Sequence, residues 1–154
     1  MLPEKSPASL RMLEGLRAAG FKITAQRRAI VELFADDASH PTAQSIYERL
    51  RDAHPGLSFA TVYNTLDALS SAGTAGLLRV GTASRFDPNT APHEHAICSV
   101  CESILDLPLL DRGEVLPDRQ DALAAHGFQV AAVETLYRGV CRECQDRAAG
   151  DRAH

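Results

Sequence analysis

The residues whose types and spacing could do chemistry lie mostly in the second half of the chain, and four cysteines are the most specific of them. They form two CxxC pairs, Cys98 with Cys101 and Cys141 with Cys144. Each pair can form a tight turn that presents two thiolates, and four thiolates suit tetrahedral Zn²⁺. The 39 residues between the pairs leave room for a strand, a helix and another strand. The spacing therefore predicts a structural zinc site that ties the end of a sheet to the C-terminal tail.

Two other interpretations of the cysteines are open. The pairs could be two independent redox dithiols, or one dithiol accompanied by a chance second pair. The doubled spacing favours structural Zn²⁺. A zinc site would contribute folding energy directly, because the unfolded chain cannot hold the four ligands in place.

A second group of residues could bind a harder metal ion. Asp87, His93, His95 and Asp106 lie within 20 residues of one another, and the segment HEH places His93 and His95 on the same side of an extended strand. Mixed nitrogen and oxygen ligands without sulfur suit Fe²⁺, Mn²⁺ or Zn²⁺. An HxH pair alone is about as compatible with a connector as with a metal site, and His54, His126 and His154 are interpreted as ordinary surface histidines.

Composition limits the class of protein. The 154 residues are 45% hydrophobic and 23% charged, which is typical of one modest core or two small ones. No apolar run is long enough for a membrane span and the first residues do not resemble a secretory signal, so we expect a cytoplasmic protein with no membrane partner. Residues 1–88 carry ten Lys and Arg against nine Asp and Glu, whereas residues 89–154 carry six against eleven, so the second half is acidic.

The first half of the chain reads as four helices and a hairpin. Leu10, Leu13 and Leu16 recur at helix spacing up to Ala19-Gly20, where a glycine suits a left-handed cap. Thr24, Thr42 and Ser58 can each cap a following helix. The predicted inward residues of these three helices are Ile30, Leu33 and Phe34, then Ile46, Tyr47 and Leu50, then Val62, Leu66 and Leu69. Residues 77–86 are typical of a short hairpin.

The second half reads as a small mixed sheet. The segments HAIC and SILDL predict strands, DALAAHG predicts a helix that ends at Gly127, and FQVAAVETLYRGV is rich in β-forming residues. The predicted fold is α+β, with an N-terminal winged helix-turn-helix domain followed by a small α/β dimerisation domain that holds a four-cysteine zinc site. Its predicted bounds are 1–86 for the DNA-binding domain, 87–92 for a turn-rich connector and 93–154 for the dimerisation domain.

Seven segments, in order along the chain, resemble the signatures of the ferric uptake regulator family. They are ITAQRRAIVELF, HPTAQSIYERL, LSFATVYNTLDAL, SRFD, HEHAICSVC, ILDL and YRGVCREC. The match covers nearly the whole chain, and it implies a homodimeric, metal-dependent repressor that binds a double-stranded DNA operator. A two-fold dimer would bind an inverted repeat.

The resemblance also implies a regulatory metal site. His40 begins the segment HPTA, where the family has a metal ligand, and it joins Asp87, His93, His95 and Asp106 to make five ligands for Fe²⁺ or Mn²⁺. Three histidines and two aspartates are similar to the peroxide-sensing branch, whereas the iron-uptake branch typically has glutamates at the two carboxylate positions. In the peroxide-sensing branch, bound Fe²⁺ reacts with hydrogen peroxide and a ligand histidine is oxidised, so His40 and His93 are the candidates here.

For DNA recognition, the resemblance makes the helix after Ser58 the recognition helix. Tyr63 matches a tyrosine that contacts bases, whereas Asn64 departs from the arginine common at that position and leaves the helix without a basic residue. Phosphate contacts must then come from the helices and hairpin around it. The predicted DNA-binding residues are Lys22, Arg27, Arg28, Ser58, Thr61, Tyr63, Asn64, Arg79 and Arg85.

Three other functions compete with this one. The nearest is an iron- or zinc-responsive repressor of the same family that does not sense peroxide. An enzyme is disfavoured because the chain has no glycine-rich cofactor loop or nucleophile motif, although His and Asp clusters with open positions can support oxygen or hydrolytic chemistry. A purely structural zinc module would leave HPTA and HEH without a role.

Overall fold

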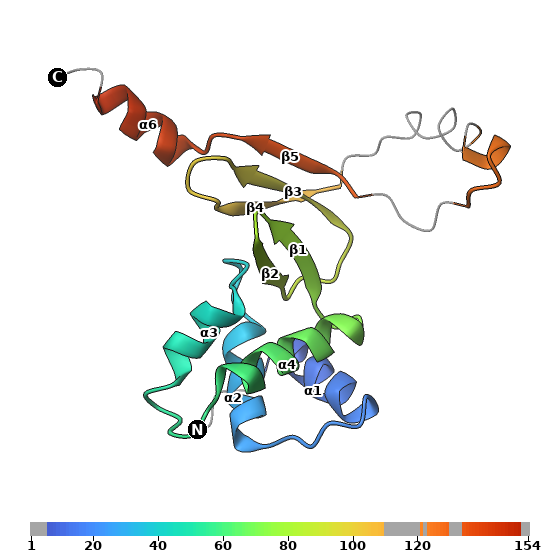
Figure 1. Cartoon of the computed structure of the whole chain (residues 1–154), viewed down its shortest axis with the longest axis vertical. Coiled ribbons are helices and arrows are strands. Elements are labelled where there is room, and N and C mark those ends of the chain that lie inside the picture. Colours follow the sequence, from blue (N-terminus) through green and yellow to red (C-terminus); the bar gives the residue numbers. More distant parts are fainter. Residues whose placement is uncertain (1–5, 110–120, 122, 130–133, 152–154) are drawn as a thin grey trace. The chain divides into compact units, whose positions relative to one another are not determined.

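The computed structural model describes residues 6–109, 121, 123–129 and 134–151. The chain divides into two compact units, Met1–Ala91 and Pro92–His154. The first contains four helices and a two-stranded hairpin, and the second contains a three-stranded sheet and a terminal helix (Figure 1). The predicted α+β class and the winged-helix arrangement of the first unit are confirmed. No helix among the described residues is both long and apolar enough to cross a membrane.

The four helices of the first unit each begin at a residue that caps them. They are α1 (Pro7–Ala18), α2 (Ala25–Phe34), α3 (Ala43–Leu50) and α4 (Phe59–Ser71), and the capping hydroxyls are those of Ser6, Thr24, Thr42 and Ser58. Each hydroxyl accepts a hydrogen bond from the backbone N–H three residues later, which satisfies one of the free donors of the first turn. Three of these four caps were predicted.

The apolar stripes of the helices meet in one core, although three residues predicted to face inward, Leu10, Leu33 and Tyr47, are not fully buried. Leu10 is 47% exposed, because Ser9, Met12, Leu13 and Leu16 form the buried side of α1. In α2, Val31 is fully buried and Leu33 only packs against the core from its edge. The predicted stripe of α4, Val62, Leu66 and Leu69, is buried as expected.

A glycine ends α1 as the sequence predicted. Gly20 has a φ of +85°, a left-handed conformation that side chains disfavour, and the N–H of Phe21 reaches back to the carbonyl of Leu16 at 2.9 Å. This bond turns the chain sharply from α1 toward α2. The loop that carries Lys22 is therefore fixed at its start.

The hairpin of the first unit consists of β1 (Gly76–Val80) and β2 (Ala83–Asp87), paired antiparallel with Gly76 opposite Asp87. Its base is joined to the start of α3, because the N–H of Phe86 donates to the carbonyl of Pro41 at 3.0 Å and the Phe86 ring is buried in the core. The hairpin is thus held against the helices at the residue that precedes Asp87.

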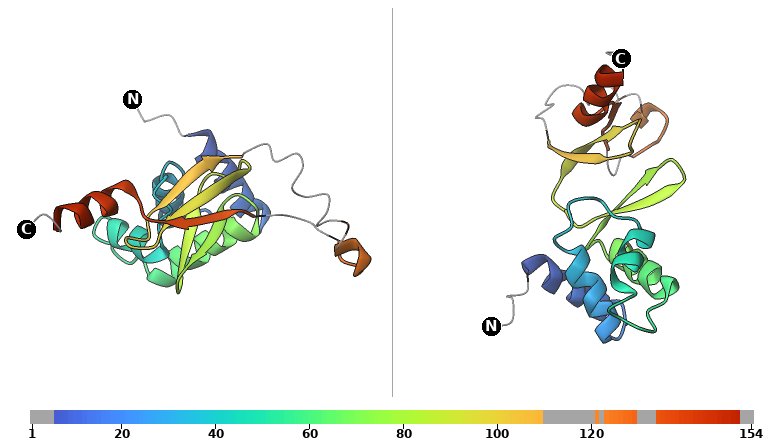
Figure 2. Two further views of the ribbon diagram at one scale, coloured as in Figure 1. Left: turned by 90° about the horizontal axis from the view of Figure 1, so that it is seen from above. Right: turned by 90° about the vertical axis from the view of Figure 1, so that its left-hand side faces the viewer.

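The sheet of the second unit has the strand order β4–β3–β5, with β3 (His93–Cys98), β4 (Ile104–Pro108) and β5 (Leu136–Gly139). β4 runs antiparallel to β3, and β5 runs parallel to it (Figure 2). The helix α6 (Arg142–Asp151) follows β5. The predicted strands HAIC and SILDL are confirmed, with β3 beginning two residues earlier than the first of them.

Between β4 and β5, the structure agrees with only part of the prediction. Residues 121 and 123–125 are helical, and Gly127, with a φ of +71°, ends the helical turn through bonds from Gly127 and Phe128 to Ala124 and Leu123. The predicted β-rich run from residue 128 to 140 is shorter, because among its described residues only Leu136–Gly139 forms a strand. Residues 130–133 of that run lie outside the described residues.

Candidate metal centres and nucleic-acid interface

Parallel pairing of β3 and β5 brings the two CxxC pairs together. Cys98, the last residue of β3, lies opposite Gly139 of β5, two residues before Cys141. The four sulfur atoms lie within 4.8 Å of one another, and the Sγ atoms of Cys101 and Cys141 are 3.7 Å apart. Thiolates that share a tetrahedral Zn²⁺ at about 2.3 Å are separated by roughly 3.8 Å. The cluster therefore fits the metal that the sequence predicted.

Backbone donors point at the first sulfur of the cluster. The N–H groups of Cys141 and Val100 donate to the Sγ of Cys98 at 3.3 and 3.4 Å. Backbone hydrogen bonds from Cys141, Cys101 and Val100 lower the pKa of Cys98 to about 6, because they favour the thiolate. A hydrogen bond with Ser103 likewise lowers the pKa of Cys101.

The last sulfur of the cluster lies in a different environment. Burial raises the pKa of Cys144 to about 12, because its thiolate would be desolvated among the other sulfurs. Arg147 of α6 opposes part of this effect, since its Nη2 donates to the Sγ of Cys144 at 2.9 Å. A divalent cation bound by all four sulfurs would supply the positive charge that favours their thiolate forms. Sequence reasoning missed Arg147, although its place three residues after Cys144 on a helix is a usable signal.

The histidines of β3 form a compact group with β4. The Nε2 atoms of His93 and His95 are 2.8 Å apart, and each lies 3.5 Å from the Oδ1 of Asp106, because His95 pairs directly with Asp106 across the two strands. Ligand atoms that bind one ion at about 2.1 Å are roughly 3 Å apart in a square or octahedral arrangement. These three side chains therefore converge as metal ligands would.

The side chain of the residue between the two histidines lies on the opposite face of the strand. Glu94 is only 4% exposed, and its carboxylate accepts a hydrogen bond of 2.9 Å from the hydroxyl of Tyr137 on β5. This pair links β3 to the strand that leads into Cys141. Sequence reasoning overlooked it, because a charged residue in the middle of HEH reads as exposed.

The first unit holds a second pair of predicted ligands. His40 and Asp87 are 1% and 2% exposed, and the Nε2 of His40 lies 3.5 Å from the Oδ2 of Asp87. His40 has a φ of +53° and precedes Pro41, and its carbonyl accepts a hydrogen bond from the Nη1 of Arg85 at 3.3 Å. An unusual backbone conformation that the surrounding structure maintains is typical of functional sites.

The aspartate of this pair is oriented by its neighbours. The Oδ1 of Asp87 accepts the N–H of Asn89 at 2.8 Å, which closes a small turn. Gly76 lies opposite in the hairpin, where a Cβ atom would come within 3.2 Å of the Cβ of Asp87. A glycine at position 76 thus leaves the room that the carboxylate occupies. No sequence pattern pointed to Gly76.

The predicted DNA-binding residues differ in exposure. Tyr63 is 43% exposed and Asn64 is also exposed, so neither is part of the core. Ser58 is exposed and bonds with its hydroxyl to Thr61, where it caps α4. Arg79 is exposed, as is Lys22, whereas Arg27, Arg28 and Arg85 are half-buried.

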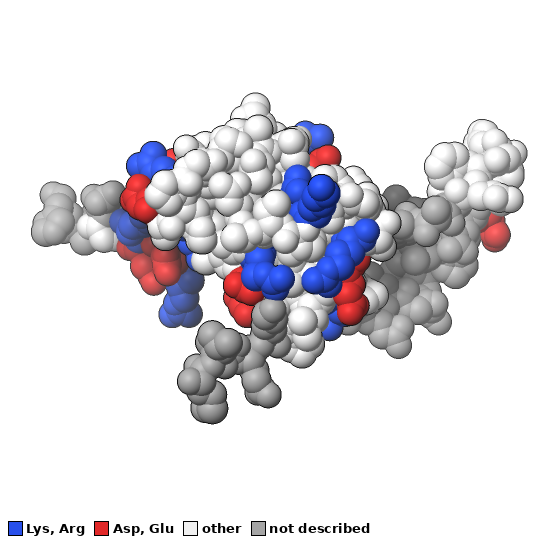
Figure 3. Space-filling model, turned by 90° about the horizontal axis from the view of Figure 1, so that it is seen from below, with Lys and Arg blue, Asp and Glu red and all other residues white. Residues whose placement is uncertain are grey.

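The charge on the helical unit is sparse. Lys and Arg side chains are scattered over the face seen in Figure 3, with Asp or Glu beside most of them, and they do not gather into one patch. α4 itself has no Lys or Arg between Phe59 and Ser71. Each single cation near α4 therefore matters more for contacts with phosphates than it would on a strongly basic surface.

Comparison with known proteins identifies relatives over most of the chain. The model of the "Ferric uptake regulator family" matches residues 18–138. The "Peroxide operon regulator" of Bacillus subtilis is 41% identical over 138 residues, which are 88% of this chain and 92% of that protein. The "Peroxide-responsive repressor PerR" of Staphylococcus aureus is 38% identical over 88% of this chain and 90% of its own length.

Solved structures are similar too. The ferric uptake regulator Fur of Helicobacter pylori, described with three functional metal-binding sites, has a TM-score of 0.69 at 20% identity and covers 90% of this chain and 91% of its own. At that identity it supports the fold alone. PerR from Streptococcus pyogenes, described in terms of peroxide sensing and gene regulation, has a TM-score of 0.50 at 28% identity and covers 94% and 98% of the two chains.

Proposed function

The chain belongs to the ferric uptake regulator family, and from this premise we propose that it is a dimeric, metal-dependent repressor that binds an inverted-repeat operator and senses hydrogen peroxide. The observation that carries the proposal is the identity of 41% and 38% to two peroxide regulators along nearly the whole chain. Members of this family are transcription regulators, and we propose that the chain is not an enzyme and works in the cytoplasm, where its DNA target would be.

We assign the two metals by the chemistry of their ligands. Structural Zn²⁺ belongs with the four thiolates of the second unit, because soft sulfur ligands select it. Fe²⁺ or Mn²⁺ belongs with nitrogen and oxygen ligands, and the proposed set is His40, Asp87, His93, His95 and Asp106. Its support is the close approach of His40 to Asp87 in the first unit and of His93 and His95 to Asp106 in the second.

The proposed switch follows from where these ligands lie in the sequence. One ion bound by both groups of ligands would connect the helical unit to the sheet unit, and metal binding would select the arrangement in which the two recognition helices of a dimer fit the operator. Bound Fe²⁺ supplies the reaction with peroxide, and His40 and His93 are the proposed sites of oxidation. Loss of one imidazole ligand would weaken metal binding and release DNA. The domain bounds 1–86, 87–92 and 93–154 remain predictions.

Exposed apolar side chains support a dimer formed by the second unit. Among the described large hydrophobic residues, eight in this unit are at least 37% exposed, against four in the first unit. Such surface is typical of an interface between protomers. The residues are Val100, Leu105, Leu109, Leu123, Phe128, Leu136, Tyr137 and Val140.

Operator binding under four conditions tests the proposal. A duplex selected from a random library by the Mn²⁺-loaded protein serves as the probe, and its affinity is measured for the zinc-loaded dimer alone, with Mn²⁺, and with Fe²⁺ before and after peroxide. We expect weak binding by the zinc-loaded dimer alone, tight binding with Mn²⁺ or Fe²⁺, and loss of binding when the Fe²⁺ form is treated with peroxide. Mass spectrometry should then find one added oxygen on His40 or His93, with His54 as the internal control.

A matched pair of variants separates the metal requirement from the fold. Asp87→Asn removes a proposed ligand, and we expect its affinity for Mn²⁺ to fall by more than about 100-fold, which exceeds the usual effect of changing an outer partner of a ligand. Asp36→Asn makes the same change at an exposed position and should bind DNA normally. DNA release without oxidation of either histidine would contradict the peroxide chemistry, and a response to iron that ignores peroxide would favour an iron-responsive repressor.

A further inference from the structure

One carboxylate holds the loop that leads to His40. The side chain of Asp37 is only 9% exposed, and its Oδ1 accepts hydrogen bonds from the N–H of Ser39 at 2.9 Å and from the Ser39 hydroxyl. Its Oδ2 accepts a hydrogen bond from the Nη1 of Arg49 on α3. A single side chain thus closes the turn before His40 and ties that turn to the helix that follows.

The charge of Asp37 strengthens both of these contacts. Burial by itself would raise the pKa of Asp37, but hydrogen bonds from Ser39 and Arg49 outweigh that effect and leave the pKa below its ordinary value. The side chain is therefore a carboxylate near neutral pH. A carboxylate paired with a guanidinium has a preferred direction as well as an attraction, so this pair can fix the orientation of a loop.

His40 needs support on both of its sides, because its backbone conformation is unfavourable. Its φ of +53° lies in the left-handed region, which residues with a side chain seldom adopt, and Pro41 restricts the residue before it further. The Nη1 of Arg85 holds the His40 carbonyl at 3.3 Å. On the other side, the neighbour Ser39 is held by Asp37. Conformations of this kind persist only when the surrounding structure maintains them.

The backbone at His40 decides where its imidazole lies. The ring is 1% exposed, and its Nε2 is 3.5 Å from the Oδ2 of Asp87 at the end of β2. The two side chains come from different elements, so each element must be held in place for them to meet. Arg85 acts from the hairpin, whereas Asp37 and Arg49 act from the helical side.

We propose that Asp37 and Arg49 are positioning residues for the regulatory metal, which hold the loop before α3 so that the His40 imidazole meets Asp87. The inference rests on the proposed function, because the ion concerned is the one assigned to His40 and Asp87. It adds two residues that are not ligands themselves and that keep one ligand of the helical unit in place before the ion binds.

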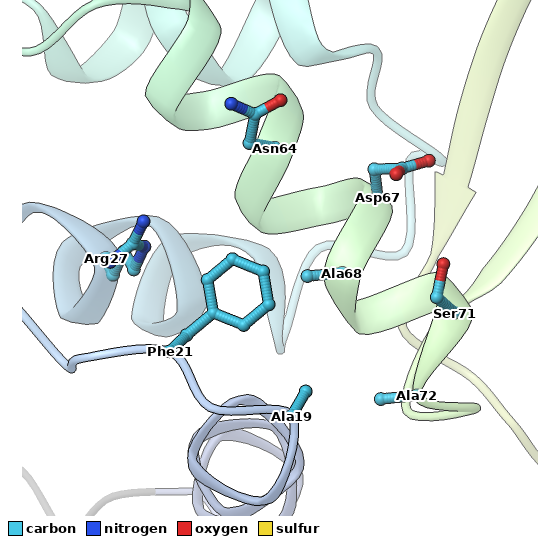
Figure 4. Close-up of a pocket in the computed structure, with 8 residues that line it drawn as sticks. All are labelled: Ala19, Phe21, Arg27, Asn64, Asp67, Ala68, Ser71 and Ala72. Atoms are coloured by element: carbon cyan, nitrogen blue, oxygen red, sulfur yellow. The ribbon is translucent and has the colours of Figure 1, made fainter.

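This role separates Arg49 from another arginine of the same unit. Arg27 donates from its Nη1 to the carbonyl of Lys22 at 2.9 Å and lines a pocket of about 490 Å³ together with Asn64 and Asp67 of α4 (Figure 4). The residues that line this pocket come from α2, from α4 and from the turns after α1 and α4. Arg49 instead contacts the loop of a proposed metal ligand, so its replacement should affect metal binding first.

Titration of the zinc-loaded protein with Mn²⁺ tests the role of Asp37. Asp37→Ala removes both acceptor oxygens, and we expect the Mn²⁺ affinity to fall by about 10-fold, the effect usual for groups that orient a metal ligand. Asp37→Asn keeps an acceptor for the N–H of Ser39 and should lose less. Asp36→Ala changes an exposed neighbour and should bind Mn²⁺ as the wild type does. Equal affinities for Asp37→Ala and the wild type would overturn the proposal.

A double variant tests whether Arg49 acts through Asp37. Arg49→Gln should weaken Mn²⁺ binding less than Asp37→Ala, because the bonds to Ser39 remain. The double variant should bind no more weakly than Asp37→Ala alone, since both changes remove the same contact. Losses that multiply would show that Arg49 does not act through Asp37. Arg51→Gln is the charge-matched control, because Arg51 is 56% exposed and lies 3.8 Å from Asp52.

Two further measurements distinguish positioning from a general loss of fold. In the zinc-loaded protein without Mn²⁺, hydrogen exchange of the Ser39 N–H should be faster in Asp37→Ala, whereas the N–H of Ala35 at the end of α2 should exchange as in the wild type. With Fe²⁺ in excess, peroxide should then add less oxygen to His40 relative to His93. Unchanged exchange at Ser39, or an unchanged ratio of the two oxidised histidines, would count against the proposal.

The wild type shows which of the two proposals fails. If the zinc-loaded wild type binds no Mn²⁺, or if Asp87→Asn binds it equally well, the proposed function fails and the inference fails with it. If Mn²⁺ binding depends on Asp87 but Asp37→Ala behaves as the wild type, only the inference fails.

Discussion

The two units of this chain are stabilised in different ways. The first has a continuous apolar core drawn from residues 12–86, in which Phe34, Phe86 and Leu66 are at most 1% exposed. In the second, the buried hydrophobic residues within the described segments are Ile97, Cys98 and Cys144, two of which are proposed zinc ligands. The helical unit can thus depend on its core, whereas the sheet unit, under the proposed function, would depend on a metal and on a partner subunit.

Under the proposed function, this difference would let each unit keep its fold while the metal acts as a switch. A helical unit with its own core could change position without losing its fold. The four proposed zinc ligands all lie in the second unit, so this unit would hold its zinc whether or not the regulatory ion is bound. The proposed regulatory ligands, in contrast, come from both units, so their metal could report on the arrangement of the two.

Removing the zinc site should destabilise the protein more than any other change considered. If it did not, the second unit would not depend on zinc and the contrast between the two units would be wrong. In small zinc domains the metal contributes on the order of 10 kcal/mol to folding. We expect Cys98→Ser to lose zinc, to become monomeric and to unfold the second unit, while the helical unit keeps its helices. Zinc analysis, gel filtration and circular dichroism measure this, and Ser99→Ala, an exposed neighbour in the same turn, should change nothing. A dimer of Cys98→Ser with full zinc content would refute the site.

A core substitution in the helical unit should give the next largest effect. Phe34 is fully buried, so Phe34→Ala removes apolar contacts and leaves a cavity, at a cost of about 3–5 kcal/mol in the free energy of unfolding. Denaturant unfolding followed by helix signal measures the loss, and the zinc content should stay at the wild-type value. Phe59→Ala is the control, because Phe59 is 43% exposed and should cost far less. Loss of zinc in Phe34→Ala would show that the units do not fold independently.

Replacing Arg147 should have a smaller effect, on zinc binding alone. It tests whether a residue outside the four cysteines helps to hold the metal. Arg147→Gln removes the donor at 2.9 Å from the Cys144 sulfur, and changes to such outer partners weaken metal binding by about 10-fold or more. We expect faster release of zinc to a chelator, with an unchanged fold before release. Arg142→Gln, on the same helix but 93% exposed, should release zinc as the wild type does. Equal rates for the two variants would limit Arg147 to a surface role.

Much of the fold could be read from local patterns, because helix caps and apolar stripes act within one or two turns. Thr24, Thr42 and Ser58 cap helices as predicted, and Gly20 ends α1 in the left-handed conformation expected of it. Leu10 is exposed, and Leu33 and Tyr47 are only partly buried; these residues lie at the edges of stripes, where the packing partner and not the helix period decides which residue is covered.

The ligand types and their local spacing were determined by the sequence alone, since CxxC turns and an HxH strand need only neighbouring residues. Tertiary structure decided what came together over long separations. The parallel register of β5 on β3 joins the cysteine pairs, the hairpin brings Asp87 to His40, and the turn after α1 directs Arg27 toward the Lys22 carbonyl. Such pairings depend on strand order and on the direction of turns, which no local pattern encodes, because they are set by the burial of whole elements against each other.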